Sequence, residues 1–554
     1  MYDVDMTRLI STFFLLTTCL ILVGCTTSRF AKLQSASVNI VQANDPAQLP
    51  VLITFNTLEL ESYCRTLPAT TDFGIVALLQ CANELLSRAD LSAQQRDFAL
   101  SAYNRNLTLL VKAEHAGRLA KDRVLIHYEN LVPFSFVDDI VALDKRLTPA
   151  ITGEIGLAIT TSRDNTQTGL DIYFPLEGVK QSATILLKNI TLQQEKTLRI
   201  SVEIKASNDN NVINLGDNKY QIRHSPAAAY LDLLEQANID DYNWLGMVSP
   251  TQAEKRRGVF VIGNISQHKI PIIMIHGLNS DPLIWRHLTM AILNNPALVA
   301  NYQIWHIYYP SGPPPFYSAA RTRDNLQQLL KTIDSPRLAK KAVIIGHSMG
   351  GVVANLLSTR ADHQLWDATF KLRPEQMDSV EPAVKDIFIY QAVFASNTVF
   401  FLDTPFKGSE VASSVIGKLG AFLVTLPTEF TKIFQNFFAR TGVHILTDKM
   451  RPFLINYGPS SIHVLRPGHP LMETLYDLPI QGESYAIIGS DGALSCQDEL
   501  TCSSISDGVV NYTSANYLHA KERLIVSSAH NSFQNEQAIA FILNKLNVAQ
   551  DDTE

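Results

Sequence analysis

The C-terminal half of the chain is predicted to be an α/β domain, in which helices cover both faces of a mostly parallel sheet. From about residue 258, short apolar runs alternate with segments of helical periodicity. Such alternation is typical of βαβ units, because parallel strands need crossover connections that lie against the sheet. The apolar runs are continuous, which indicates strands that are buried on both faces.

The order of elements follows from these runs. We expect strands at 258–263, 270–275, 302–309, 341–346, 398–403, 484–489 and 522–528, and helices at 283–294, 319–333, 349–360 and 535–547. Ligands of such sheets bind beyond the carboxyl ends of the strands, so the loops that follow the strands are searched for functional residues.

Two insertions, at 362–397 and about 410–480, interrupt the predicted domain of residues 258–554. The second contains the apolar run 415–426 and a helix from about residue 428. On that helix, one stripe has helical spacing and comprises Phe430, Ile433, Phe434, Phe437 and Phe438. The stripe fits either a cap or lid that lines a binding pocket, or a helix packed against the core.

The preceding residues 51–257 are predicted to form an accessory region that is first helical and then β-rich. Helical spacing covers 58–122, and β-branched runs occur at 155–161, 184–191 and 198–204. A further helix is expected at 226–238, because Pro226 suits its first turn.

Composition narrows the class of protein. The 554 residues are 46% hydrophobic and 18% charged, which excludes collagen-like and wholly disordered chains. A formal charge of -7 argues against a nucleic acid partner, since no basic surface is indicated.

The first residues indicate export. The apolar run 9–23 is shorter than the roughly 20 residues that span a bilayer and suits a signal peptide. It ends in Leu22-Val23-Gly24-Cys25, which resembles the lipobox of bacterial lipoproteins. The resemblance implies that residues 1–24 are removed, that Cys25 carries diacylglycerol, and that 25–50 form a tether.

Details near this segment leave alternatives open. An ordinary signal peptide, or a short anchor with a chance cysteine, would also fit the apolar run. A start at Met6 instead of Met1 gives the positive charge expected of a signal peptide. Thr26 favours outer-membrane sorting in the bacterial cell envelope, because Asp at that position would resemble the inner-membrane retention signal.

Four further cysteines form two local couples, Cys64 with Cys81 and Cys496 with Cys502. An oxidising compartment would allow each couple to form a disulfide, whereas the alternative is free buried thiols.

A nucleophile is indicated where the strand 341–346 runs into GHSMGG (346–351) and then a helix. A sharp strand-to-helix turn needs glycines for close backbone approach and lifts the hydroxyl of Ser348 above the sheet edge. A serine hydroxyl is a weak nucleophile, so it requires a base and an acid that orients the base.

The base and the acid are sought in the expected chain order of Ser, then Asp or Glu, then His. His530 follows the last strand and is the histidine placed to reach Ser348. The preceding loop offers four acids, of which Asp507 is preferred, with Asp491 next and Asp498 and Glu499 as the others. Asp403, after the strand 398–403, is a further candidate.

Acyl transfer also needs donors for the developing oxyanion. The turn at His276-Gly277-Leu278 ends the strand 270–275, so the backbone N–H of Leu278 is paired with that of Met349 as the predicted oxyanion hole. We expect the side chain of His276 to matter less than this backbone.

Five segments together resemble the α/β-hydrolase superfamily, and within it the bacterial lipases and esterases. They are MIHGLNSD (274–281), GHSMGG (346–351), DTPFKGS (403–409), SDGVV (506–510) and SAHNSF (528–533). The resemblance implies a serine acyl-hydrolase with an ester or lipid substrate and no organic cofactor. In the third segment, Phe406 replaces the histidine that is usual in lipases. Some related lipases bind calcium, but no acidic cluster in this sequence argues for it, so no metal is expected.

The sequence therefore predicts a membrane-anchored serine ester hydrolase with the triad Ser348, Asp507 and His530. One alternative is an acyltransferase or amide hydrolase that uses the same triad. Another is a non-catalytic surface lipoprotein whose accessory region binds a protein partner. Neither the physiological ester nor such a partner is indicated by the sequence.

Overall fold

The computed structural model describes residues 28–35, 38–43, 52–193, 197–208, 210–236, 253–409, 426–496 and 498–551. The predicted signal peptide, Cys25, parts of the tether and the run 415–425 lie outside these residues. Within the described part of the chain, no helix combines the length and apolar character needed to cross a membrane.

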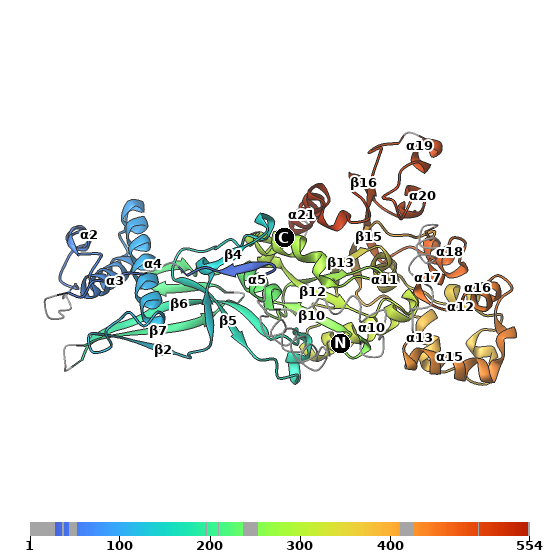
Figure 1. The fold of residues 1–554 in the computed structure, drawn as a ribbon, viewed down its shortest axis with the longest axis horizontal. Coiled ribbons are helices and arrows are strands. Elements are labelled where there is room, and N and C mark those ends of the chain that lie inside the picture. The colour runs from blue at the N-terminus through green and yellow to red at the C-terminus, as the bar shows by residue number, and fades with distance from the viewer. Residues whose placement is uncertain are drawn as a thin grey trace, which may run out of the picture.

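A seven-stranded sheet forms the centre of the C-terminal domain (Figure 1). Its strand order is β10-β12-β11-β13-β14-β15-β16, and all neighbours are parallel except β10 and β12. The strands are β10 (Gly258–Ile262), β11 (Ile270–Ile275), β12 (Tyr302–Tyr308), β13 (Lys341–His347), β14 (Ser396–Leu402), β15 (Gly482–Ser490) and β16 (Glu522–Ser527). The predicted α/β class with a mostly parallel sheet is confirmed.

Helices cover both faces of this sheet because its strands carry apolar residues on both sides. On β11, Ile273 and Ile275 join the core beneath α10 (Pro315–Ile333) and α11 (Met349–Ser358). Ile272 and Met274, which alternate with them, join the opposite core. That second core is closed by α5 (Pro226–Gln236), α8 (Arg286–Leu293), α9 (Pro296–Asn301) and α21 (Glu536–Asp551).

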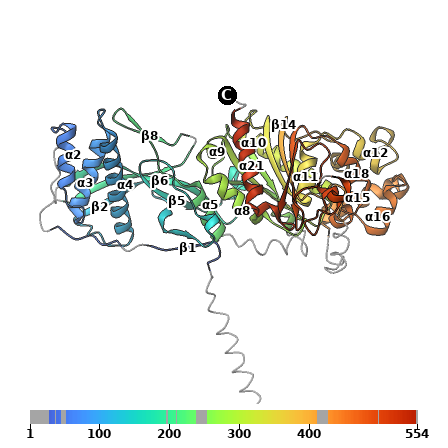
Figure 2. The ribbon, with the colours of Figure 1, turned by 90° about the horizontal axis from the view of Figure 1, so that it is seen from above.

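The N-terminal region forms a second sheet at the opposite end of the molecule from the helices of the insertions (Figures 1 and 2). Its order is β2-β7-β6-β5-β3, and α3 and α4 pack on one face. The elements are α2 (Thr57–Thr66), α3 (Asp72–Leu86), α4 (Ala93–His115), β2 (Val124–Glu129), β3 (Phe134–Phe136), β5 (Leu157–Arg163), β6 (Val179–Leu192) and β7 (Leu198–Ala206). A disulfide between Cys64 and Cys81 joins α2 to α3.

The two sheets share packing at their junction. Tyr173 and Phe174 of the N-terminal region belong to the core beneath α10, and α5 helps to close the opposite core. The sequence assigns α5 to the accessory region, and α5 does pack on β5 and β6, but its Tyr230 ring also lies 6.0 Å from the His306 ring of β12, measured between centroids. The boundary at residue 257 therefore separates two sheets and does not separate two independent cores.

Part of the predicted tether is docked. β1 (Ala31–Leu33) pairs antiparallel with β4 (Ile140–Ala142). The Glu235 carboxylate of α5 accepts hydrogen bonds from the backbone N–H groups of Phe30 and Ala31, at 2.7 and 2.9 Å. The expectation of a tether throughout 25–50 is wrong for these residues, because a short strand satisfies its backbone on β4.

The insertions form a cluster of helices beyond one end of the sheet, which we call the cap (Figure 1). Its helices are α12 (Gln364–Thr369), α13 (Pro382–Phe388), α15 (Thr428–Thr441), α16 (Met450–Tyr457), α17 (Ser461–Val464) and α18 (Pro470–Asp477). The apolar stripe of α15 has two roles. Phe437 is buried and packs on Phe370, with the two ring centroids 5.2 Å apart. Phe430, Phe434 and Phe438 line a cavity.

Candidate active site

Ser348 lies on a sharp turn between β13 and α11. Its backbone has φ 54° and ψ −126°, a conformation that residues with a side chain rarely adopt and that is concentrated at functional sites. Glycines permit the turn, because a Cβ on Gly350 would lie 2.3 Å from the carbonyl oxygens of Ile275 and His276. The helix can therefore approach β11 only with glycine at this position.

The structure brings three predicted residues into one hydrogen-bonded relay. With the His530 proton on Nδ1, this nitrogen donates to Oδ2 of Asp507 at 2.6 Å. The Ser348 hydroxyl then donates to Nε2 of His530 at 2.9 Å. The three residues come from the loops after β13, β15 and β16, whose carboxyl ends meet at one edge of the sheet.

Asp507 is held firmly by its own loop. Its Oδ1 accepts the backbone N–H groups of Val509 and Val510, at 2.8 and 2.6 Å, which leaves Oδ2 for His530. The other acids of this loop are placed elsewhere: Asp491 is exposed, and Asp498 caps the short helix α19 (Glu499–Ser503).

The disulfide between Cys496 and Cys502 closes part of the same loop. It joins the segment before α19 to that helix, upstream of Asp507. A short covalent ring limits the conformations open to a loop, so this disulfide supports the acid from a distance.

The charges around His530 favour its protonated form. Burial alone would lower the pKa of the ring, but the hydrogen bond and charge of Asp507, joined by the charge of Asp403, outweigh burial. The pKa of His530 is therefore raised above its usual value. Such a ring takes a proton from a serine hydroxyl more readily than an unpaired buried histidine does.

The predicted oxyanion donors lie beside Ser348. A Cβ on Gly277 would be 3.0 Å from Cβ of Ser348, so the turn before Leu278 directly contacts the nucleophile. Asn279, which follows Leu278, donates its backbone N–H to Oγ of Ser311 at 3.0 Å and so fixes this loop. Met349 begins α11, where backbone N–H groups of the first turn have no partner within the helix.

The His276 ring is held by the backbone of this region: Nδ1 lies 3.0 Å from the Gly277 carbonyl oxygen, and Nε2 accepts the N–H of Tyr309 at 3.4 Å. The buried ring stacks on Tyr309 with centroids 4.5 Å apart, and Tyr309 donates its hydroxyl to the His276 carbonyl at 2.7 Å. Burial lowers the pKa of His276 to about 4, so the ring is neutral near neutral pH. Its role is structural, as the sequence suggests.

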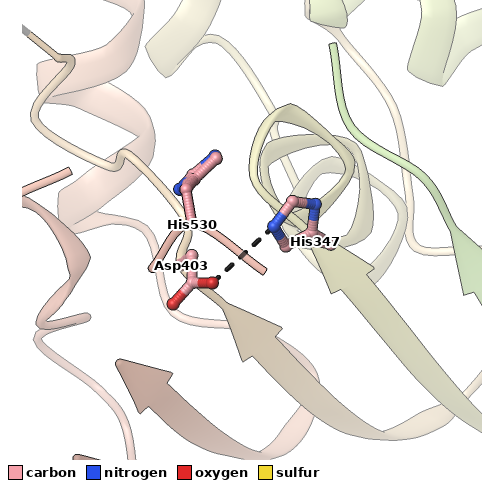
Figure 3. Close-up of side chains that lie close together, drawn as sticks. All are labelled: His347, Asp403 and His530. Carbon is pink, nitrogen blue, oxygen red and sulfur yellow. Dashed lines mark ion pairs between the residues drawn. The ribbon is translucent and has the colours of Figure 1, made fainter. Parts of the chain in front are cut away.

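A second carboxylate, that of Asp403, lies close to His530 and His347 (Figure 3). Asp403 is fully buried at the end of β14, and its Oδ2 is 3.7 Å from Nε2 of His347. One ligand atom each of His347, Asp403 and His530 lie within 4.8 Å of one another, which is compatible with a metal ion. However, both ring nitrogens of His530 are engaged by Asp507 and Ser348, so this ring has no lone pair left for an ion.

Sequence reasoning did not recognise His347 and gave Asp403 only as an alternative acid. Two signals were available. His347 lies inside the GHSMGG segment directly before the nucleophile, and Asp403 directly follows a predicted buried strand whose carboxyl end lies at the same sheet edge.

The fold and the relay together define a domain with the α/β-hydrolase fold, in which Ser348 lies on the sharp turn after β13. Residues 272–451 match the family model described as the Alpha/beta hydrolase family. This match agrees with the α/β-hydrolase fold of the C-terminal domain and supports a hydrolase activity. No curated protein matches the chain.

Several solved structures are similar to about half of this chain. The mature lipase BlEst2 of Bacillus licheniformis is 13% identical, with a TM-score of 0.30, over 52% of this chain and 97% of that one. A lipase-esterase related protein from Clostridium acetobutylicum is 13% identical, with a TM-score of 0.27, over 52% and 99%. The thioesterase domain from the curacin biosynthetic pathway is 13% identical, with a TM-score of 0.26, over 52% and 95%.

Proposed function

We propose that the protein is a serine carboxylic-ester hydrolase, with Ser348 as nucleophile, His530 as general base and acid, and Asp507 as the acid that orients the base. The observation that carries this proposal is the continuous relay from Ser348 through His530 to Asp507, at 2.9 and 2.6 Å. Nucleophilic catalysis by serine requires such a relay, because the hydroxyl must lose its proton as it attacks.

The reaction follows from these positions. Ser348 attacks the ester carbonyl while Nε2 of His530 takes its proton, and the backbone N–H groups of Leu278 and Met349 bind the oxyanion. His530 then protonates the leaving alcohol, which leaves the acyl group on Ser348. Water that is deprotonated by His530 attacks this acyl-enzyme, and the acid and free Ser348 are restored.

A fluorophosphonate probe tests this proposal, because it labels serines that an adjacent base activates. Wild-type protein lacking residues 1–24 is expected to be labelled and to hydrolyse p-nitrophenyl butyrate, whereas Ser348→Ala is expected to do neither. Labelling that persists in Ser348→Ala, or full hydrolysis by that variant, would refute the assignment. Transfer of the acyl group to added alcohols, in preference to water, would instead support the acyltransferase alternative.

The cap supplies a binding site for an apolar acyl chain. A cavity of about 640 Å³ lies among the cap helices and the start of α10, within the size range of ligand sites in proteins. Its wall is largely apolar and includes the rings of Phe316, Phe370, Phe430, Phe434, Phe438 and Phe453. An apolar chain would be stabilised by removal from water in proportion to the area it buries here.

The segment after β12 runs from the loop beside Ser348 to the wall of the cavity. Pro314 of this segment lines the cavity, while Ser311 accepts the hydrogen bond from Asn279 beside the oxyanion turn. Gly312, between them, accepts the backbone N–H of Ser461 from the cap at 2.9 Å. We therefore propose that the cavity receives the acyl part of the ester.

Narrowing the cavity is expected to discriminate by chain length. Val464 is buried in the cavity wall, so Val464→Phe should lower kcat/KM for p-nitrophenyl palmitate by roughly tenfold and change that for the butyrate less than twofold. Val443→Phe is the matched control, because Val443 is exposed on the cap and does not line the cavity. Equal losses on both esters would argue against an acyl site here.

We also propose that the enzyme is anchored to the bacterial cell envelope through a lipid on Cys25. The lipobox-like segment supports this proposal, as does the pair of disulfides, since disulfides persist in oxidising compartments. Wild-type full-length protein should partition into the detergent phase of Triton X-114, and Cys25→Ser should move to the aqueous phase. Partitioning that Cys25→Ser leaves unchanged would exclude the lipid anchor.

A further inference from the structure

Asp403 joins the two segments that carry the other members of the relay. Its Oδ1 accepts the backbone N–H of Gly489 at 2.7 Å, and its Oδ2 accepts that of Ser532 at 3.1 Å. Gly489 is the last residue but one of β15, the loop after which carries Asp507, and Ser532 lies two residues after His530. The Asp403 carboxylate therefore connects β15, which leads to Asp507, with the loop that carries His530.

The backbone at Gly489 packs directly against Asp507 and against the residue before His530. A Cβ on Gly489 would lie 3.0 Å from Cβ of Asp507 and 3.0 Å from the carbonyl oxygen of Ala529. The backbone held by Asp403 thus touches both the orienting acid and the residue before His530. A shift of this backbone would move both ends of the hydrogen bond between Asp507 and His530.

Asp403 is also unusual in its own conformation and burial. Its backbone φ is +51°, in the left-handed region that costs most residues energy, and its side chain has no exposed surface. A buried carboxylate is costly unless it is hydrogen-bonded or paired with charge. Burial alone would raise the pKa of the Asp403 carboxyl, but the nearby His347 ring, the charge of His530 and the backbone N–H of Ser532 together lower it.

Three titratable groups face His530, and each comes from a different element. Asp507 follows β15, Asp403 follows β14, and His347 ends β13 with its ring centroid 4.9 Å from that of His530. Burial lowers the pKa of His347, so this ring is neutral near neutral pH and adds no positive charge. The imidazolium of His530 would form between two carboxylates (Figure 3 shows Asp403 beside both rings).

We propose that Asp403 is a positioning residue for the base: its carboxylate clamps the segments of Asp507 and His530 together and places a second negative charge beside the imidazolium. This inference rests on the proposed function, because it assigns a task within the same relay. The hydrogen bonds of the Asp403 carboxylate go to Gly489 and Ser532 and not to Ser348, so we expect this residue to act through His530.

The test compares Asp403→Asn with wild type. Asn removes the charge and can accept only one of the two N–H groups, so kcat is expected to fall by about 100-fold while KM changes less than threefold. The pKa of His530 should fall by about one unit, because a nearby negative charge favours the imidazolium. Asp403→Ser, which also removes the charge, provides the same readouts if the Asn variant does not fold.

The pKa of His530 is measured by NMR titration of protein labelled with 13C-histidine. The signal of His530 is identified as the one that the variant His530→Gln lacks. This titration needs no substrate, so a wild type that hydrolyses no ester would refute the proposed function while the role of Asp403 is still measured. Asp232→Asn is the matched control, because Asp232 is also a buried carboxylate. It pairs with Lys180, with Oδ2 3.0 Å from Nζ, and does not belong to the relay.

The control is expected to lower Tm without moving kcat or the pKa of His530. If Asp403→Asn behaves in the same way, with kcat per fluorophosphonate-labelled site within twofold of wild type and an unchanged pKa of His530, Asp403 is only a structural carboxylate. A fall in kcat together with a lower pKa of His530 supports the proposal.

Discussion

In an Asp507→Asn variant, kcat for p-nitrophenyl butyrate is expected to fall by about four orders of magnitude. The reason lies in how Asp507 is held. Oδ1 accepts two backbone N–H groups, from Val509 and Val510, so an Asn side chain would keep its oxygen there and turn its amide N–H toward His530. Nδ1 of His530 would then have to accept a hydrogen bond.

The neutral His530 ring of this variant would therefore carry its proton on Nε2 instead of Nδ1. A proton on Nε2 cannot coexist with acceptance of the Ser348 proton, so the base is disabled although the geometry is kept. Initial rates at saturating substrate, normalised to folded protein, measure the effect. Asp491→Asn serves as control, because Asp491 is exposed and does not contact His530. If the control lost activity and Asp507→Asn kept it, the assignment of the acid would be wrong.

The pH dependence provides a second readout of the same bond. The base must be neutral to accept the Ser348 proton, and the pKa of His530 is raised by Asp507 and Asp403. The acid limb of kcat/KM in wild type should therefore have its midpoint above about 6.5, the usual value for histidine. Activity should be lost as the pH falls through this midpoint.

Replacing Gly350 with Ala is expected to give the largest loss of stability. The new Cβ would lie 2.3 Å from the carbonyl oxygens of Ile275 and His276. Ile275 is the last residue of the strand β11 and His276 follows it, so both oxygens belong to backbone that cannot easily move. Alanine favours a helix over glycine by about 1 kcal/mol, but overpacking against a rigid backbone costs about 3 kcal/mol. The net result is a lower Tm, together with displacement of the turn that carries Leu278.

Thermal unfolding followed by circular dichroism measures this change. A net loss of about 2 kcal/mol corresponds to a drop in Tm of roughly 4–8 °C for a domain of this size. Gly492→Ala is the control, because a Cβ at Gly492 would meet no atom within 4 Å. Equal Tm values for the two variants would mean that the close approach of α11 to β11 is not needed for stability.

The parts of this protein that the sequence predicts are those with a local physical signature. The strand 270–275 agrees with the structure because a buried strand needs a continuous apolar run. The turn around Ser348 is readable because glycines must flank it. By contrast, the helix expected at 283–294 begins as a 3₁₀ turn over Pro282–Trp285, where Asp281 caps Leu283.

Features that depend on distant contacts were less accessible. Residues near Ala31 have no apolar periodicity, yet they form a strand because β4 and Glu235 supply their hydrogen-bond partners. The stripe on α15 was ambiguous for the same reason: its spacing gives one apolar face, but only the packed structure divides that face between the core and the cavity.

The sequence by itself determines the kind of domain, the turn that presents Ser348 and the order in which the base and its acid follow. Each of these follows from local propensity or from a short motif. Only the tertiary structure decides which carboxylates meet His530, because Ser348 and His530 are 182 positions apart and loop acids have no periodicity that encodes their direction. It places Asp507 against the ring and Asp403 behind it, since the carboxyl ends of β14 and β15 converge there.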